Sequence, residues 1–187
     1  MTNTPFSEEY KRSFLRGEVF AYPTEAVFGL GCDPRNEKAV MTLLRLKQRP
    51  VHKGLILIAS SQQQLIHFAD FASLSQQQLD QVSASWPGPF TWLVPKKPDT
   101  PDYLTGGSNL IAVRVSAHPI VTQLCEFLGS AIVSTSANLS GQEPARNPDE
   151  VKAQFGNSML CIAGQVGEQR HPSQIRNALT GDLVRVG

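Results

Sequence analysis

Residues 131–146, AIVSTSANLSGQEPAR, place small hydrogen-bonding side chains directly after an apolar run. They are Ser134, Thr135, Ser136, Asn138 and Ser140. A turn requires only one or two such side chains. The serine-rich loop, residues 134–141, could be a set of turn caps, or it could supply hydroxyl and backbone N–H donors to a phosphate or an amino acid.

A second candidate site is a group of basic residues. Arg45, Lys47, Arg49 and Lys53 fall in a stretch that contains no acidic residue. Cations near a helix C-terminus are favoured by the helix dipole for purely structural reasons. Pro50 would end the helix here and hold the cations in a rigid corner suited to phosphate oxygens. Both interpretations are open from the sequence.

A third candidate is Arg114, which stands alone in the apolar stretch 111–116, IAVRVS. An unpaired buried charge is very costly, so this arginine must face solvent, form an internal salt bridge or bind an anion. The planar guanidinium is well suited to a carboxylate. A carboxylate ligand and a structural salt bridge therefore remain alternatives.

Several common types of site are not indicated. The sequence contains no G-x-S-x-G, G-x-G-x-x-G or G-K-[ST] motif. The histidines lack metal-ligand spacing, so no resident metal is predicted and any metal would arrive with a substrate. The cysteines form no C-x-x-C pair and are predicted to be buried apolar thiols: Cys32, Cys125 and Cys161.

The composition is that of a globular protein with no strong charge bias. The 187 residues carry a net charge of +1, which argues against non-specific coating of nucleic acid. The N-terminal stretch 1–18 lacks the apolar core of a signal peptide, and the longest apolar run, near 54–60, is too short to span a bilayer. We expect a cytoplasmic protein without a membrane segment.

The elements that would position these residues alternate between helix and strand. Helices are predicted over 7–16, from Asn36 to Pro50, over 118–129 and over 148–156, and two further helices could begin at Ser61 and Ser75. Strands are predicted over 18–23, 54–60, 89–95, 110–116, 130–136, 159–163 and 182–187. This order predicts an α/β sheet with substantial parallel pairing, in which ligands bind beyond the carboxyl ends of strands. The serine-rich loop follows such a strand end.

Six stretches, in this order, resemble the YrdC-like family, the threonylcarbamoyl-AMP synthases. They are YPTEAVFGLGCDP, LKQRP, WPGPFTWLVP, AVRVSAHP, STSANLSG and the terminal LVRVG. The resemblance is to the short single-domain bacterial form and covers one domain, residues 7–187. It implies a twisted open mixed sheet with flanking helices and a basic concave site.

The resemblance also implies a reaction. L-threonine, bicarbonate and ATP would give threonylcarbamoyl-adenylate and pyrophosphate, with Mg²⁺ entering on the ATP. Partner proteins would then transfer the threonylcarbamoyl group to adenosine 37 of tRNA, and weak contact with tRNA could accompany catalysis.

The family's functional residues carry over onto matching positions. The resemblance implies that Lys47 and Arg49 are catalytic, binding ATP phosphates and stabilising the transition state. ATP would be bound by Lys47, Arg49, Lys53, Ser136, Asn138, Ser173 and Arg185. Threonine would be bound by Thr24, Arg114 and Ser134.

Two positions depart from the pattern of many longer relatives. Ala26 and Ile58 stand where those relatives have a threonine and a histidine associated with substrate binding.

A different class of function, an RNA-binding or ribosome-assembly module, is supported only by the local excess of basic residues.

Overall fold

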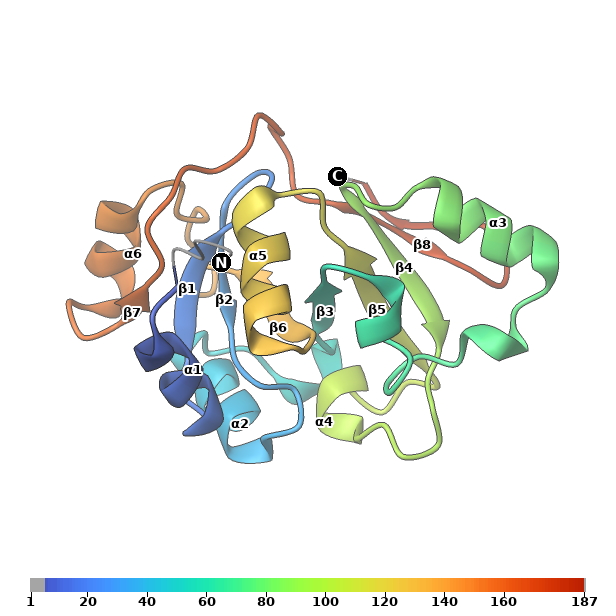
Figure 1. The fold of residues 1–187 in the computed structure, drawn as a ribbon, viewed down its shortest axis with the longest axis horizontal. Coiled ribbons are helices and arrows are strands. Elements are labelled where there is room, and N and C mark those ends of the chain that lie inside the picture. The colour runs from blue at the N-terminus through green and yellow to red at the C-terminus, as the bar shows by residue number, and fades with distance from the viewer. Residues whose placement is uncertain (1–5, 187) are drawn as a thin grey trace.

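A computed structural model describes residues 6–186, and residues 1–5 and Gly187 lie outside the described residues. Residues 1–5 belong to the N-terminal stretch 1–18, which lacks the apolar core of a signal peptide. Its centre is one mixed sheet, with strands in the order β7-β1-β2-β6-β3-β5-β4-β8-β9 and helices around it (Figure 1). The strands are β1 Phe20–Pro23, β2 Phe28–Gly31, β3 Ile56–Ala59, β4 Phe90–Pro95, β5 Leu110–Val115, β6 Ile132–Ser136, β7 Leu160–Cys161, β8 Gln174–Asn177 and β9 Leu183–Arg185. The predicted α/β class with an open mixed sheet is confirmed.

Strand pairing is more antiparallel than the alternation of elements suggests. Within residues 6–186, β1 with β7, β3 with β5 and β4 with β8 are parallel, and the other pairs are antiparallel. Two strands were not predicted. β2 lies inside the motif YPTEAVFGLGCDP, where its two glycines weaken the strand signal. The four residues of β8, QIRN, are mostly polar and all partly buried, so they lack the apolar pattern that marks a strand.

The helices follow most of the predicted ranges. They are α1 Glu8–Leu15, α2 Glu37–Leu46, α3 Gln76–Ala84, α4 Asp102–Thr105, α5 Pro119–Leu128 and α6 Pro148–Phe155. Asn36 caps α2 by accepting from the backbone N–H of Ala39, and Ser75 forms a capping box with Gln78. Gly129 closes α5 in the left-handed conformation, as expected.

Three helix predictions need correction. Ser7 precedes α1 but makes no side-chain capping bond. α2 ends at Leu46 rather than at Pro50, because Gln48 takes a left-handed conformation that no helix can continue through. Ser61 precedes only a short 3-10 helix, Gln62–Gln64, and does not cap it.

Apolar side chains cover both faces of the sheet. Leu57 of β3 belongs to the larger core, together with residues of α2 and α3. Its neighbour Ile58 points to the opposite face and packs with residues of α1 and α5, which Figure 1 shows in front of the sheet. Ile58 is therefore a core residue.

The remaining predictions concern cysteines and membranes. Cys32 and Cys125 are buried, Cys161 is partly buried, and all three are free thiols, as expected. None of the helices in residues 6–186 has the length and apolar character needed to span a bilayer.

Candidate active site

A cavity opens on the face of the sheet that also carries α1 and α5. Strand register explains which residues reach it, because directly paired residues project from the same face. Ile56 pairs with Ser134, Ile58 with Arg114, and Gly29 with Ser136. Core side chains fill this face beneath α5, and Ile56, Arg114, Ser134 and Ser136 line the cavity beside them.

The serine-rich loop begins within β6, so Ser134 and Ser136 have strand geometry. The hydroxyl of Ser136 donates to Asn138 Oδ1 at 2.5 Å, and the Asn138 amide donates to the carbonyl oxygens of Leu139 and Gln142. Asn138 is thus engaged within the loop and does not line the cavity. The structural hydrogen bonds within the loop confirm the turn-cap interpretation for Asn138, and Ser134 and Ser136 face the cavity, where their donation to a ligand stays a prediction.

Lys47 is buried beneath this loop. Its ammonium donates to the carbonyl oxygen of Ser136, to that of Asn138 at 2.7 Å and to Asn138 Oδ1 at 3.2 Å. Burial, and then the nearby charge of Arg49, lowers the pKa of Lys47 to about 8. Lys47 therefore connects the end of α2 to the loop by hydrogen bonds and does not itself line the cavity.

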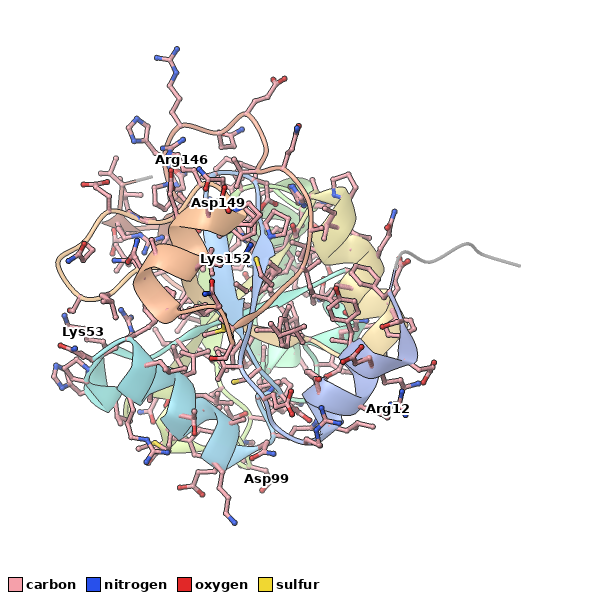
Figure 2. All side chains as sticks on the ribbon, turned by 90° about the vertical axis from the view of Figure 1, so that its left-hand side faces the viewer. Arg12, Lys53, Asp99, Arg146, Asp149 and Lys152 are labelled. Atoms are coloured by element: carbon pink, nitrogen blue, oxygen red, sulfur yellow. The ribbon has the colours of Figure 1, made fainter. Side chains whose placement is uncertain are left out.

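Arg49 and Lys53 lie at different distances from the cavity. Arg49 lines it, and its guanidinium donates to the carbonyl oxygen of Gly54 at 3.0 Å. Burial lowers the pKa of Arg49. Lys53 is exposed at the edge of the molecule (Figure 2) and does not line the cavity.

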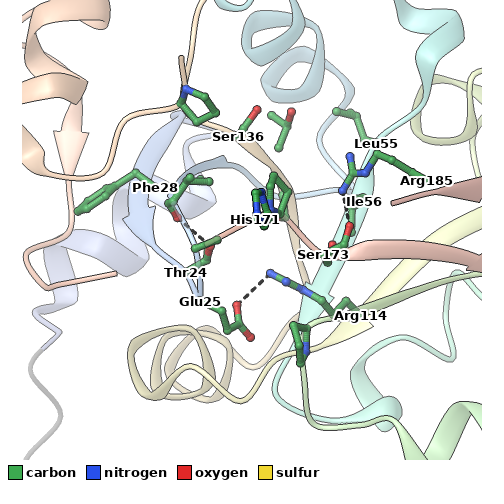
Figure 3. Close-up of a pocket in the computed structure, with 18 of the residues that line it drawn as sticks. Thr24, Glu25, Phe28, Leu55, Ile56, Arg114, Ser136, His171, Ser173 and Arg185 are labelled. Carbon is green, nitrogen blue, oxygen red and sulfur yellow. Dashed lines mark hydrogen bonds and ion pairs between the residues drawn. The ribbon is translucent and has the colours of Figure 1, made fainter. Parts of the chain in front are cut away.

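Arg114 is buried and forms an ion pair with Glu25, whose Oε2 lies 3.2 Å from Arg114 Nη2 (Figure 3). Glu25 Oε1 accepts from the hydroxyl of Ser116 at 2.7 Å and from the backbone N–H of Ala117 at 3.2 Å. Both Arg114 and Glu25 line the cavity. The internal salt bridge that the sequence left open is present, at a place where a ligand could also reach the guanidinium.

The β1–β2 turn supplies another wall. The hydroxyl and the backbone N–H of Thr24 both donate to the carbonyl oxygen of Val27, at 2.7 and 3.1 Å, and so close the turn. Ala26 lines the cavity, whereas Ile58 does not. Only one of the two departures from the longer relatives therefore lies at the cavity.

A segment near the C-terminus crosses this turn. We call residues 162–173 the strap. Gly167 N–H donates to the carbonyl oxygen of Thr24 at 2.9 Å, Gln169 N–H donates to that of Glu25 at 3.0 Å, and the Gln165 carbonyl oxygen lies 3.0 Å from His118 Nε2. These contacts hold the strap against the turn. The C-terminal end of the strap, residues His171, Pro172 and Ser173, lines the cavity.

Ser173 and Arg185 join the site through β8 and β9. The Ser173 hydroxyl lies 2.8 Å from Thr91 Oγ1, and Arg185 Nη2 donates to the Ser173 carbonyl oxygen at 2.7 Å. Burial, and then the charges of Arg114 and Arg49, lowers the pKa of Arg185. Three guanidinium groups therefore share one cavity with the single carboxylate of Glu25, and the surplus of positive charge suits an anionic ligand.

The structure brings most of the predicted site residues together. Those that line the cavity are Thr24, Arg49, Arg114, Ser134, Ser136, Ser173 and Arg185. Lys47 and Asn138 support it through the serine-rich loop, and Lys53 lies apart. Sequence reasoning did not assign Glu25 and His171; the signal for Glu25 was a lone acid in an apolar stretch, complementary to the lone Arg114.

Comparisons with known proteins show which proteins this chain resembles. The Sua5_yciO_yrdC family model, described as "Telomere recombination", matches residues 12–187. Proteins of Yersinia enterocolitica and Serratia proteamaculans named threonylcarbamoyl-AMP synthase are 57% and 56% identical over 170 residues, covering 91% of this chain and 90% of each protein. The crystal structure of P. abyssi Sua5 complexed with L-threonine matches with a TM-score of 0.83 at 30% identity, over 90% of this chain and 49% of that chain.

Proposed function

The chain belongs to the Sua5/YciO/YrdC family, and from this premise we propose that it is a threonylcarbamoyl-AMP synthase. The enzyme joins L-threonine, bicarbonate and ATP into threonylcarbamoyl-adenylate and releases pyrophosphate. The observation that carries the proposal is the cavity, where three guanidinium groups, one carboxylate and the serine-rich loop meet in a chain closely similar to proteins of that name.

The chemistry needs orientation and charge neutralisation more than a protein nucleophile. The ammonium group of threonine first loses a proton, and the resulting amine combines with bicarbonate to give a carbamate and water. A carbamate oxygen then bonds to the α-phosphorus of ATP, and the bond from that phosphorus to the pyrophosphate oxygen breaks. Positioned cations are suited to this step because negative charge accumulates on the phosphate oxygens.

The proposed roles of the residues follow their places in the structure. Arg49, Arg185, Ser136 and Ser173 bind the nucleotide from the cavity wall, and Thr24, Arg114 and Ser134 bind threonine. Lys47 and Asn138 contribute through the loop that they hold together, and Lys47 reaches the phosphates only by leaving its carbonyl partners. A role for Lys53 on the exposed rim stays a prediction.

Mg²⁺ would enter as part of the ATP substrate. Residues 6–186 hold no group of three or more His, Cys, Asp or Glu side chains placed to bind a metal ion. The carboxylate in the cavity, Glu25, is engaged by Arg114 and Ser116. We propose that phosphate oxygens and water coordinate the ion, in keeping with the preference of Mg²⁺ for such ligands.

The product implies partners, because an adenylate is an activated intermediate. We propose that other proteins consume it to modify adenosine 37 of tRNA in the cytoplasm, and that any contact of this chain with tRNA is weak. A non-catalytic RNA-binding module is less well supported, since the arginines converge in a cavity rather than along an open surface.

Omission of single substrates tests the proposal. Pyrophosphate release should require ATP, threonine and bicarbonate together, because the attacking oxygen exists only on the carbamate, and RNA should be dispensable. Serine should be a poorer substrate by about 1–3 kcal/mol, since it lacks the methyl group of threonine. Pyrophosphate release from ATP alone, or salt-sensitive RNA binding without any turnover, would contradict the proposal.

A further inference from the structure

The Glu25–Arg114 pair contains two buried polar atoms without a hydrogen-bond partner. Glu25 Oε2 and Arg114 Nε are both buried and make no hydrogen bond within residues 6–186. Such atoms are uncommon in native proteins, and each calls for an explanation. Because both side chains line the cavity, a ligand is a direct explanation.

Glu25 is held in a defined position. Its Oε1 accepts from Ser116 and Ala117, and its backbone carbonyl oxygen accepts from Gln169 of the strap. Burial raises the pKa of Glu25, but the charge of Arg114 and the hydrogen bond from Ser116 lower it by more, so the carboxylate is ionised at neutral pH. What remains is a fixed anionic acceptor, Oε2, lying 3.2 Å from Arg114 Nη2 (Figure 3).

An α-amino acid is complementary to this arrangement. It carries an ammonium group and a carboxylate on the same carbon, so its two charges lie as close together as those of a salt-bridged pair. The ammonium can donate to a carboxylate oxygen, and the carboxylate can accept from a guanidinium N–H. A bound amino acid would therefore give Glu25 Oε2, which has only the ion pair with Arg114, and Arg114 Nε a hydrogen-bond partner each.

We propose that Glu25 binds the α-amino group of threonine while the neighbouring Arg114 binds its carboxylate. The inference rests on the proposed function and extends it to a residue with no previous role. Glu25 would select an α-amino acid over an α-hydroxy acid. It would also hold the nitrogen that becomes the carbamate nitrogen.

Calorimetry with two ligands tests this assignment. The ligands are L-threonine and 2,3-dihydroxybutanoate, in which a hydroxyl replaces the amine while the carboxylate and the methyl group remain. Glu25→Gln should weaken threonine binding at least tenfold and binding of the analogue less than threefold. Arg114→Lys, which keeps the charge but loses the planar fork, should weaken both ligands to a similar extent.

Control variants keep the test interpretable. Glu168→Gln removes an exposed carboxylate from the strap and should leave both affinities unchanged. If Glu25→Gln fails to fold, Glu25→Asp keeps the charge on a shorter side chain and should still weaken threonine more than the analogue.

Two results would overturn the inference. Equal weakening of both ligands by the Glu25 variants would mean that Glu25 only positions Arg114. Threonine binding that is unchanged in Glu25→Gln would remove any role for the carboxylate. By contrast, a wild-type protein that binds no threonine would overturn the proposed function itself.

Discussion

Arg49 and Lys47 are close in sequence but have different surroundings. The guanidinium of Arg49 lines the cavity, whereas the ammonium of Lys47 is surrounded by loop oxygens. A direct phosphate contact is therefore best supported for Arg49. Lys47 is bonded to the loop, and we expect its positive charge to act on the ligand from beneath the loop.

Arg49→Ala should reduce adenylate formation at least tenfold, because a lost charge-assisted phosphate contact costs about 1.5–3 kcal/mol. The measurement is pyrophosphate release by the purified, folded variant. Arg45→Ala is the matched control, since Arg45 is exposed and bonds only within α2. Equal activity in the two variants would mean that Arg49 only stabilises the C-terminal end of α2 and does not contact the phosphates.

The lowered pKa of Lys47 predicts a pH dependence of ATP binding. A lysine is cationic only below its pKa, so the charge is present at pH 7 and is lost as pH rises through about 8. ATP affinity, measured by calorimetry without threonine, should fall by up to about tenfold between pH 7 and pH 9. Lys47→Arg, which does not titrate in this range, should show a flatter profile; the same decline in that variant would assign it to another group.

The elements that close the site are the β1–β2 turn and the strap. Neither is held by a long helix or strand: backbone hydrogen bonds between Thr24 and Gly167 and between Glu25 and Gln169 join them. Gly167 allows this approach, because a Cβ atom there would lie 2.7 Å from the Glu25 carbonyl oxygen. The position of Glu25 thus depends on a segment far away in the sequence.

Gly167→Ala should displace the strap and weaken threonine binding several-fold. Forcing an extra methyl group against backbone typically costs about 1–3 kcal/mol, so the melting temperature should also fall by a few degrees. Glu168→Ala, a change at an exposed neighbour on the same strap, is the control for both measurements. Wild-type threonine affinity in Gly167→Ala would show that the strap does not set the geometry of the site.

One sheet separates two apolar layers across the protein. Leu57 and Ile58 are consecutive residues of β3, fully buried, and belong to different layers. Because β1, β3 and β6 each contribute to both layers, we expect residues 7–187 to unfold as a single domain.

Leu57→Ala and Ile58→Ala should each lower the free energy of unfolding by about 2–5 kcal/mol within one cooperative transition. Chemical denaturation followed by both fluorescence and circular dichroism measures this. Leu15→Ala, at a residue 64% exposed, should change it little. Two separate transitions, each sensitive to only one of the core substitutions, would contradict the single-domain prediction.

Local signals in the sequence were sufficient for most helices. Asn36 and Ser75 cap helices by bonds to residues three positions away, and Gly129 ends α5 through its own backbone conformation. Such interactions lie within one turn of chain, so a sequence pattern contains them. β2 was missed because its two glycines weaken the strand signal. β8 and the strap were missed because they are held by β4 and by the β1–β2 turn, segments far away in the sequence that no local pattern records.

Residue types and their spacing were enough to indicate the candidate chemistry: the isolated Arg114, the cations after α2 and the serine-rich loop. Which of these residues meet depends on contacts between segments far apart in the chain. The tertiary structure turned Arg114 and Ser134 toward one cavity through strand register, set Lys47 at the end of α2 beneath the loop and left Lys53 exposed on the rim. It also brought Glu25, in the β1–β2 turn, beside Arg114 of β5. A buried charge is stable only with a partner, and here the two partners are far apart in the sequence.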